Sequence, residues 1–143
     1  MQTEFSLHPQ LEKDTLFVTD LHLSRVLLMN DSQFPWLILV PRRQNCVEIY
    51  DLPQEEINTL FHESLSIGKM LMQYFNGDKL NTGALGNLVP QLHLHHIVRF
   101  KNDIAWPSPV WGKQKPKAYS KDIADKHIHD LQILLNQLFP KKA

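Results

Sequence analysis

The chain has 143 residues, of which 43% are hydrophobic and 21% are charged, as in an ordinary globular protein. Its 15 Lys and Arg balance its 15 Asp and Glu, which argues against general attraction to nucleic acid polymers or anionic membranes. A single cysteine, Cys46, excludes an internal disulfide, and no segment approaches the roughly 20 apolar residues of a membrane span. We therefore expect one domain over residues 1–143, located in the cytoplasm.

Short segments rich in β-branched and large apolar residues predict the strands. They cover residues 15–19, 24–29 and 36–41, and the turn residues from Asn30 to Ser32 separate the last two. Residues 79–84 and 92–100 supply two more strands. Because the connections between the early strands are short, we expect antiparallel pairing.

Two longer segments show the apolar spacing of amphipathic helices. The first covers residues 52–76, with Asp51 as its expected N-cap and Gly77 as its expected stop. The second runs from 121 to 138, with Ser120 as its cap. The order of elements predicts an α+β fold, in which a mainly antiparallel sheet of about five strands carries two main helices.

The stretch "NLVPQLHLHHIVRF", residues 87–100, places histidines on a segment that otherwise reads as a buried strand. Side chains alternate on a strand, so Gln91, His93 and His95 share one face. Leu92, Leu94 and His96 share the other. The His-x-His pair fits metal binding, catalysis or a structural role, but a metal site needs a third ligand that the spacing does not provide. We interpret the remaining histidines as ordinary: His8, His22, His62, His96, His127 and His129.

The longer stretch "NTGALGNLVPQLHLHHIVR" resembles the signature of the histidine triad (HIT) family of nucleotidyl hydrolases and transferases. Asn81 and Gly83 match its Asn-x-Gly, and Gly86 matches its turn. His93 matches the middle histidine of the triad and His95 the third. The sequence departs from the pattern at Gln91, where the first histidine is expected, and at Gln44, where many members have a further histidine.

The resemblance implies a nucleophile at His93 that attacks the α-phosphorus of a nucleotide and forms a nucleotidyl-histidine. It implies that His95 contacts the phosphate or the leaving group, as an imidazolium that donates a proton or stabilises charge. Gln91 would hydrogen-bond a bridging oxygen without acting as an acid. The substrate-binding residues by resemblance are Asn81, Gly83, Gly86 and Asn87 around the phosphate and Asn30 at the ribose.

The resemblance therefore implies a HIT-like fold and an enzyme that acts on a nucleoside phosphoramidate, a dinucleoside polyphosphate or a related nucleotide conjugate. No metal or other cofactor is required, and a homodimer is the expected assembly. Two alternatives stay open. A nucleotide-binding sensor without turnover is motivated by the missing first histidine, and a metal-dependent enzyme would use the His-x-His pair.

Overall fold

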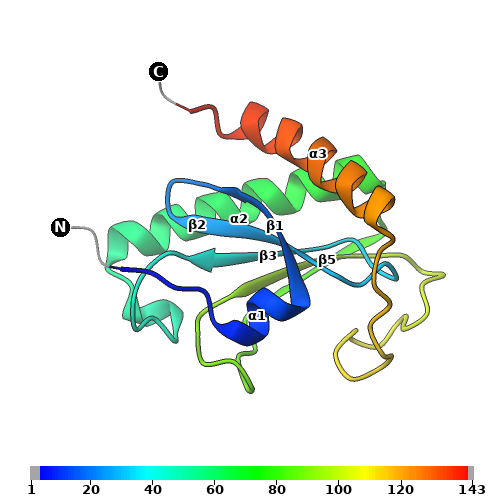
Figure 1. Ribbon diagram of the computed structural model, residues 1–143, viewed down its shortest axis with the longest axis horizontal. Coiled ribbons are helices and arrows are strands. Elements are labelled where there is room, and N and C mark those ends of the chain that lie inside the picture. Colours follow the sequence, from blue (N-terminus) through cyan, green and yellow to red (C-terminus); the bar gives the residue numbers. More distant parts are fainter. Residues whose placement is uncertain (1–3, 142–143) are drawn as a thin grey trace.

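The computed structural model describes residues 4–141, so the outermost residues of the predicted domain 1–143 lie outside the described part. Five strands form one antiparallel sheet in the order β1-β2-β3-β5-β4 (Figure 1). Their bounds are β1 Thr15–Asp20, β2 Ser24–Met29, β3 Trp36–Pro41, β4 Lys79–Gly83 and β5 Leu94–Arg99. The predicted fold class, including the antiparallel pairing, is confirmed.

The helices are α2 (Gln54–Phe75) and α3 (Lys121–Leu138), with a short α1 (Pro9–Asp14) and a 3₁₀ turn, η1 (Ile49–Asp51), in addition. Ser120 caps α3 as predicted, because its hydroxyl accepts a hydrogen bond from the Ile123 backbone N–H. None of the helices in the described chain is long and apolar enough to cross a membrane.

The ends of α2 differ from the prediction. Asp51 does not cap the helix, because its carboxylate accepts hydrogen bonds from the backbone N–H groups of Val47 and Glu48 inside the preceding turn. Pro53 occupies the N-cap position instead. At the other end Asn76 takes the left-handed conformation, with φ of 53°, and ends the helix one residue before Gly77.

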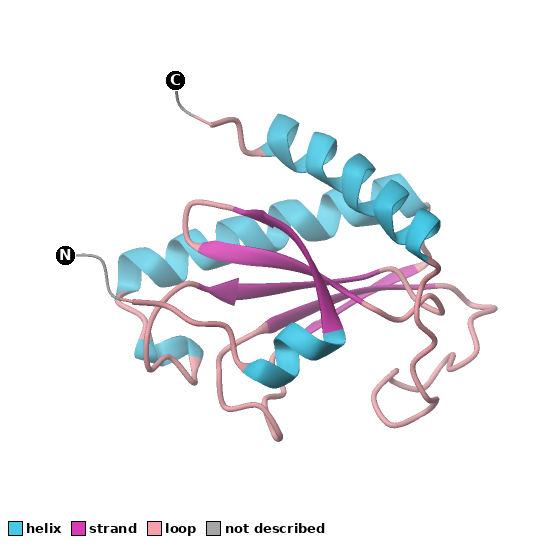
Figure 2. Ribbon diagram, viewed as in Figure 1, coloured by secondary structure: helices cyan, strands magenta, loops and turns pink. Residues whose placement is uncertain are grey.

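The two faces of the sheet are covered differently. Helices α2 and α3 pack on one face through an apolar cluster that includes Val26, Leu39 and Val98 of the sheet (Figure 1). On the other face, Trp36, Ile38 and Ile97 pack against the N-terminal segment with α1 and against the loop between β5 and α3 (Figure 2). Because both faces are covered, the central strands β3 and β5 are buried along their whole length. Polar side chains on β5 therefore need partners inside the protein.

Candidate active site

His93 lies immediately before β5, and its ring is held by the backbone. Its Nδ1 is 2.7 Å from the carbonyl oxygen of Gln91. A carbonyl can only accept, so Nδ1 carries the hydrogen and the lone pair lies on Nε2. Burial lowers the pKa of His93, the bond to Gln91 opposes that change, and the nearby charge of His8 lowers the pKa further. His93 is therefore neutral at pH 7, with Nε2 able to act as a nucleophile.

The neighbouring His95 has the opposite arrangement. The indole N–H of Trp36 donates to His95 Nδ1 at 3.0 Å, so the lone pair lies on Nδ1 and the hydrogen on Nε2. Burial, followed by the neighbouring His93 and His96, lowers the pKa of His95 to about 3. The imidazolium role expected from the sequence requires a second proton on Nδ1, which would face the indole N–H of Trp36. His95 is a neutral donor through Nε2.

The two rings lie side by side, with centroids 4.9 Å apart and planes at 70°. Their side chains are almost covered, at 6% exposed for His93 and 5% for His95. One ring offers a lone pair and the other an N–H group. Such a pair suits attack on an electrophilic centre, because its nucleophile and its hydrogen-bond donor lie side by side.

His96 faces the helices and takes no part in this pair. Its Nε2 lies 2.7 Å from the hydroxyl of Ser64 on α2, and both side chains are buried. Burial lowers the pKa of His96 to about 4. The contact with α2 supports the structural role that we expected for this histidine.

Gln91 does not use its side chain on the two rings. Its Oε1 accepts from the backbone N–H of His8 at 2.8 Å, and its Nε2 donates to the carbonyl of Ser6 at 2.9 Å. The amide group therefore binds the N-terminal segment to the strand that carries the histidines. The expected bond from Gln91 to a bridging oxygen would compete with these two contacts.

Strand β4 brings two of the predicted substrate-binding residues to the His95 face. Gly83 pairs with His95 and Asn81 pairs with Ile97, so both residues lie on the same face of the sheet as His95. Arg99, which is 2% exposed, donates to the side-chain oxygen Oδ1 of Asn81 at 2.8 Å and forms an ion pair with Asp103. The amide nitrogen of Asn81 is then the group available to a ligand.

The other predicted substrate-binding residues are not hydrogen-bonded to the two histidines in the described part of the chain. Gly86 and Asn87 lie in the exposed connection after β4, and within residues 4–141 neither is hydrogen-bonded to His93 or His95. Gly86 has φ of 66°, which a residue with a side chain adopts only under strain. The Asn30 side chain accepts from the Tyr119 backbone N–H at 2.9 Å and so holds the segment before α3.

Two cavities are lined by residues that contact the two histidines, although neither lining includes His93 or His95 themselves. A cavity of about 660 Å³ is lined by Trp36 and Trp111, which both contact the His95 ring, and by Lys113 and Lys115. A polar cavity of about 580 Å³ is lined by Gln91, Gln44 and the N-terminal segment. Both volumes fall within the range of small-molecule sites.

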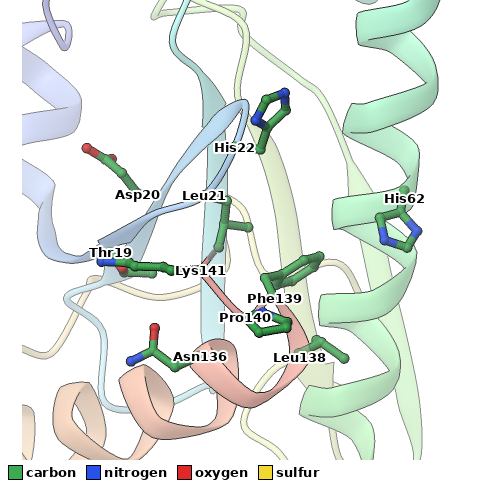
Figure 3. A pocket seen from close by; sticks show the side chains of 10 residues that line it. All are labelled: Thr19, Asp20, Leu21, His22, His62, Asn136, Leu138, Phe139, Pro140 and Lys141. Carbon is green, nitrogen blue, oxygen red and sulfur yellow. The ribbon is translucent and has the colours of Figure 1, made fainter. Parts of the chain in front are cut away.

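A further cavity, of about 710 Å³, lies between the β1–β2 hairpin, α2 and the end of α3 (Figure 3). It contains His22 and His62, which come from different elements and are not hydrogen-bonded to each other in the described chain. We do not take it as the active site, because in the described chain none of its lining residues is hydrogen-bonded to, or stacked on, His93 or His95. Within residues 4–141, no three His, Cys, Asp or Glu side chains gather where they could hold a metal ion.

Comparison with known proteins identifies the family. The profile of the HIT domain family matches residues 10–102, which include the sheet, α2 and both histidines. The chain belongs to the HIT family. No curated protein matches the chain.

Three solved structures of HIT proteins share the fold closely. A histidine triad protein from Marinobacter aquaeolei VT8 is 50% identical, with a TM-score of 0.92 over 95% of this chain and 99% of that one. A histidine triad protein from Bradyrhizobium japonicum is 44% identical, with a TM-score of 0.89 over 92% and 98% of the two chains. A third, from Sinorhizobium meliloti 1021, is 36% identical, with a TM-score of 0.87 over 92% and 96%.

Two features of the candidate site were not predicted from the sequence. The first is Trp36, which was read only as the start of a strand. A buried indole N–H requires an acceptor, and the histidine-rich strand was the obvious source of one. The second is the N-terminal segment, whose backbone groups form hydrogen bonds with the side chain of Gln91. No pattern in residues 4–8 indicates that contact.

Proposed function

We propose that this HIT protein is a nucleotidyl hydrolase or transferase that acts at the α-phosphorus of a nucleotide conjugate. The substrate is a nucleoside phosphoramidate, a dinucleoside polyphosphate or a related compound. The lone pair of His93 Nε2 forms a bond to phosphorus while the bond from phosphorus to the leaving group breaks. Water or another acceptor then displaces His93 from the nucleotidyl-histidine and takes the nucleotide.

One observation carries the proposal: the bond between His93 Nδ1 and the Gln91 carbonyl, at 2.7 Å. It orients the ring and places the lone pair on the other nitrogen. The N–H at His95 Nε2 would donate to a phosphoryl or leaving-group oxygen, and the Asn81 amide would assist it from β4. The aromatic and lysine side chains of the 660 Å³ cavity suit a ligand with a base and phosphates.

The test uses a fluorogenic adenosine phosphoramidate and three proteins: the wild type, His93→Ala and His129→Ala. We expect the wild type and the His129 control, which removes an exposed histidine of α3, to release the fluorophore. His93→Ala should lose activity by about 100-fold or more. Mass spectrometry of the quenched wild-type reaction should show a nucleotidyl group on His93. Equal turnover by His93→Ala would overturn the proposal.

A nucleotide-binding protein without turnover is the second candidate. The observation that favours it concerns Gln91, which stands where the first histidine of the triad is expected. Its side chain is hydrogen-bonded to the backbone of Ser6 and His8 and is therefore not available to the substrate. Tight binding of a nucleotide in calorimetry, with no turnover and no adduct on His93, would select this candidate. Turnover that a chelator leaves unchanged would argue against the metal-dependent alternative.

We also propose a homodimer, as membership of the family suggests. Strands β1 and β4 are the two edges of the sheet, so the sheet can be extended by a partner only at one of them. Sedimentation should give the mass of two chains of 16.7 kDa. A monomer at micromolar concentration would contradict this assembly.

A further inference from the structure

The hydrogen bond between Trp36 and His95 joins two neighbouring strands inside the protein. Trp36 begins β3 and pairs with Ile97 of β5. Its indole N–H donates to His95 Nδ1 at 3.0 Å, and the two rings lie 5.6 Å apart at 58°. Trp36 is 6% exposed and His95 is 5% exposed. Water therefore has little access to compete for either partner.

The chemistry of indole makes this contact one-directional. The ring nitrogen of tryptophan donates and has no lone pair available to accept. A hydrogen on His95 Nδ1 would therefore place two N–H groups against each other. Only the neutral ring with its hydrogen on Nε2 satisfies both partners. His93 has the opposite tautomer, with its hydrogen on Nδ1, because that nitrogen donates to the Gln91 carbonyl. A different neighbouring group therefore fixes the tautomer of each ring.

We propose that Trp36 is a positioning residue, which keeps Nε2 of His95 protonated and turned toward the reacting phosphate beside His93. This inference rests on the proposed function. Trp36 also lines the 660 Å³ cavity, but this role does not depend on its own contact with the substrate. It acts through His95 by excluding the Nδ1-protonated tautomer and the imidazolium, and by restraining the ring angle.

A second tryptophan supplies a matched control. Trp111 packs against the same His95 ring, with centroids 5.1 Å apart and planes at 73°. Its indole nitrogen is buried and has no hydrogen-bond partner within residues 4–141. Replacing either tryptophan with Phe keeps an aromatic ring against His95 but makes it smaller, and only Trp36→Phe removes a hydrogen bond to His95.

The first measurement is made on the wild-type protein. Nitrogen-15 NMR of histidine-labelled wild type, with His95→Gln used to assign the signal, reports the protonation of each ring nitrogen. We expect His95 Nδ1 to be unprotonated and Nε2 to be protonated from pH 8 to pH 5. Protonation of Nδ1 at pH 7 in the wild type would overturn the proposal.

The second measurement compares the two Phe variants. In Trp36→Phe we expect the His95 signals to show exchange between tautomers or protonation at a higher pH than in the wild type. We also expect kcat for the phosphoramidate to fall roughly 10- to 100-fold with little change in KM. Trp111→Phe should keep the wild-type signals. Identical His95 signals and kcat in the two variants would contradict a special role for Trp36.

These results separate the two proposals. Expected His95 signals without turnover in any protein, the wild type included, would contradict the proposed function and leave the tautomer assignment standing. Normal turnover with Nδ1 of His95 protonated would contradict the tautomer assignment and leave the proposed function standing. Heteronuclear spectra of both variants, compared with the wild type, check that the fold is intact.

Discussion

At the scale of single residues, the two successive histidines of β5 have different surroundings. The ring of His95 faces Trp36 on one side of the sheet, and the ring of His96 faces Ser64 of α2 on the other. The alternation of a strand produces this separation without any special backbone geometry. A change at His96 should therefore affect stability, and a change at His95 should affect chemistry.

Ser64→Ala tests this division. It leaves Nε2 of the buried His96 without a partner, which should lower the free energy of unfolding by about 1–3 kcal/mol. Urea denaturation measures the loss. Turnover of the phosphoramidate at a temperature where the variant is folded should stay at the wild-type level. A stable variant with reduced kcat would contradict the separation of the two faces.

At the scale of elements, the parts of the chain that depend on local pattern were predictable. The bounds of α3 and its Ser120 cap agree with the prediction, and the strands agree within a few residues. Helix α1 was missed because its six residues are too short to show a period. The cap at Asp51 was wrong because that carboxylate binds the turn before the helix.

The candidate site was predictable only in part. A period of two placed His93 and His95 on one face. The contact between Trp36 and His95 spans 59 positions and requires the pairing of β3 with β5, which sequence periodicity does not provide. The tautomers of both rings follow from that pairing and from the fold of residues 91–93.

The N-terminal segment gives a prediction at this scale. Gln91→Ala removes the acceptor for the His8 backbone N–H and the donor to the Ser6 carbonyl. Hydrogen exchange of the His8 amide should accelerate by about tenfold, because each such bond is worth about 1 kcal/mol. The control is Gln44→Ala, which changes a residue of the same cavity. Equal exchange in both variants would show that Gln91 does not hold the segment.

The loop after β5 depends on one buried ion pair. Arg99 and Asp103 are 2% and 5% exposed, with nitrogen and oxygen 2.8 Å apart. Although burial alone raises the pKa of Asp103, Arg99 and three backbone N–H groups hold it at about 2. Arg99→Met should therefore cost about 3–5 kcal/mol in urea denaturation, because it leaves a buried carboxylate without its cation.

Lys121→Met is the control for that measurement. It breaks an ion pair with Asp125 in which both side chains are exposed, at 86% and 61%. The unfolding midpoint of this variant should match the wild type. A similar midpoint for Arg99→Met would show that the loop does not depend on the buried pair.

At the scale of the whole molecule, β5 and the residue before it carry three histidines that are neutral in the fold. Burial is the largest cause of the lowered pKa of His93, His95 and His96. The unfolded chain takes up protons at these positions as the pH falls through about 6.5, whereas the folded chain does not. Acidification therefore favours unfolding, and the stability is restored as the pH rises above 6.5.

We expect the free energy of unfolding to fall between pH 7.5 and pH 5.5. Each buried histidine contributes up to about 1.4 kcal/mol per pH unit below its unfolded pKa. Burial raises the pKa of Glu63, which acts in the opposite direction, so a comparison of variants isolates the histidines. Urea titrations should show a shallower dependence for His93→Ala than for the wild type, and no change for the exposed His129→Ala. Parallel curves for all three proteins would contradict the expectation.

The chain has three tryptophans, and two of them, Trp36 and Trp111, contact the His95 ring. Indole emission responds to the charge and polarity of its immediate surroundings. The protein therefore contains two intrinsic fluorophores beside His95. Occupation of the neighbouring cavity can be followed optically in unlabelled protein, on the millisecond scale of a stopped-flow mixing experiment.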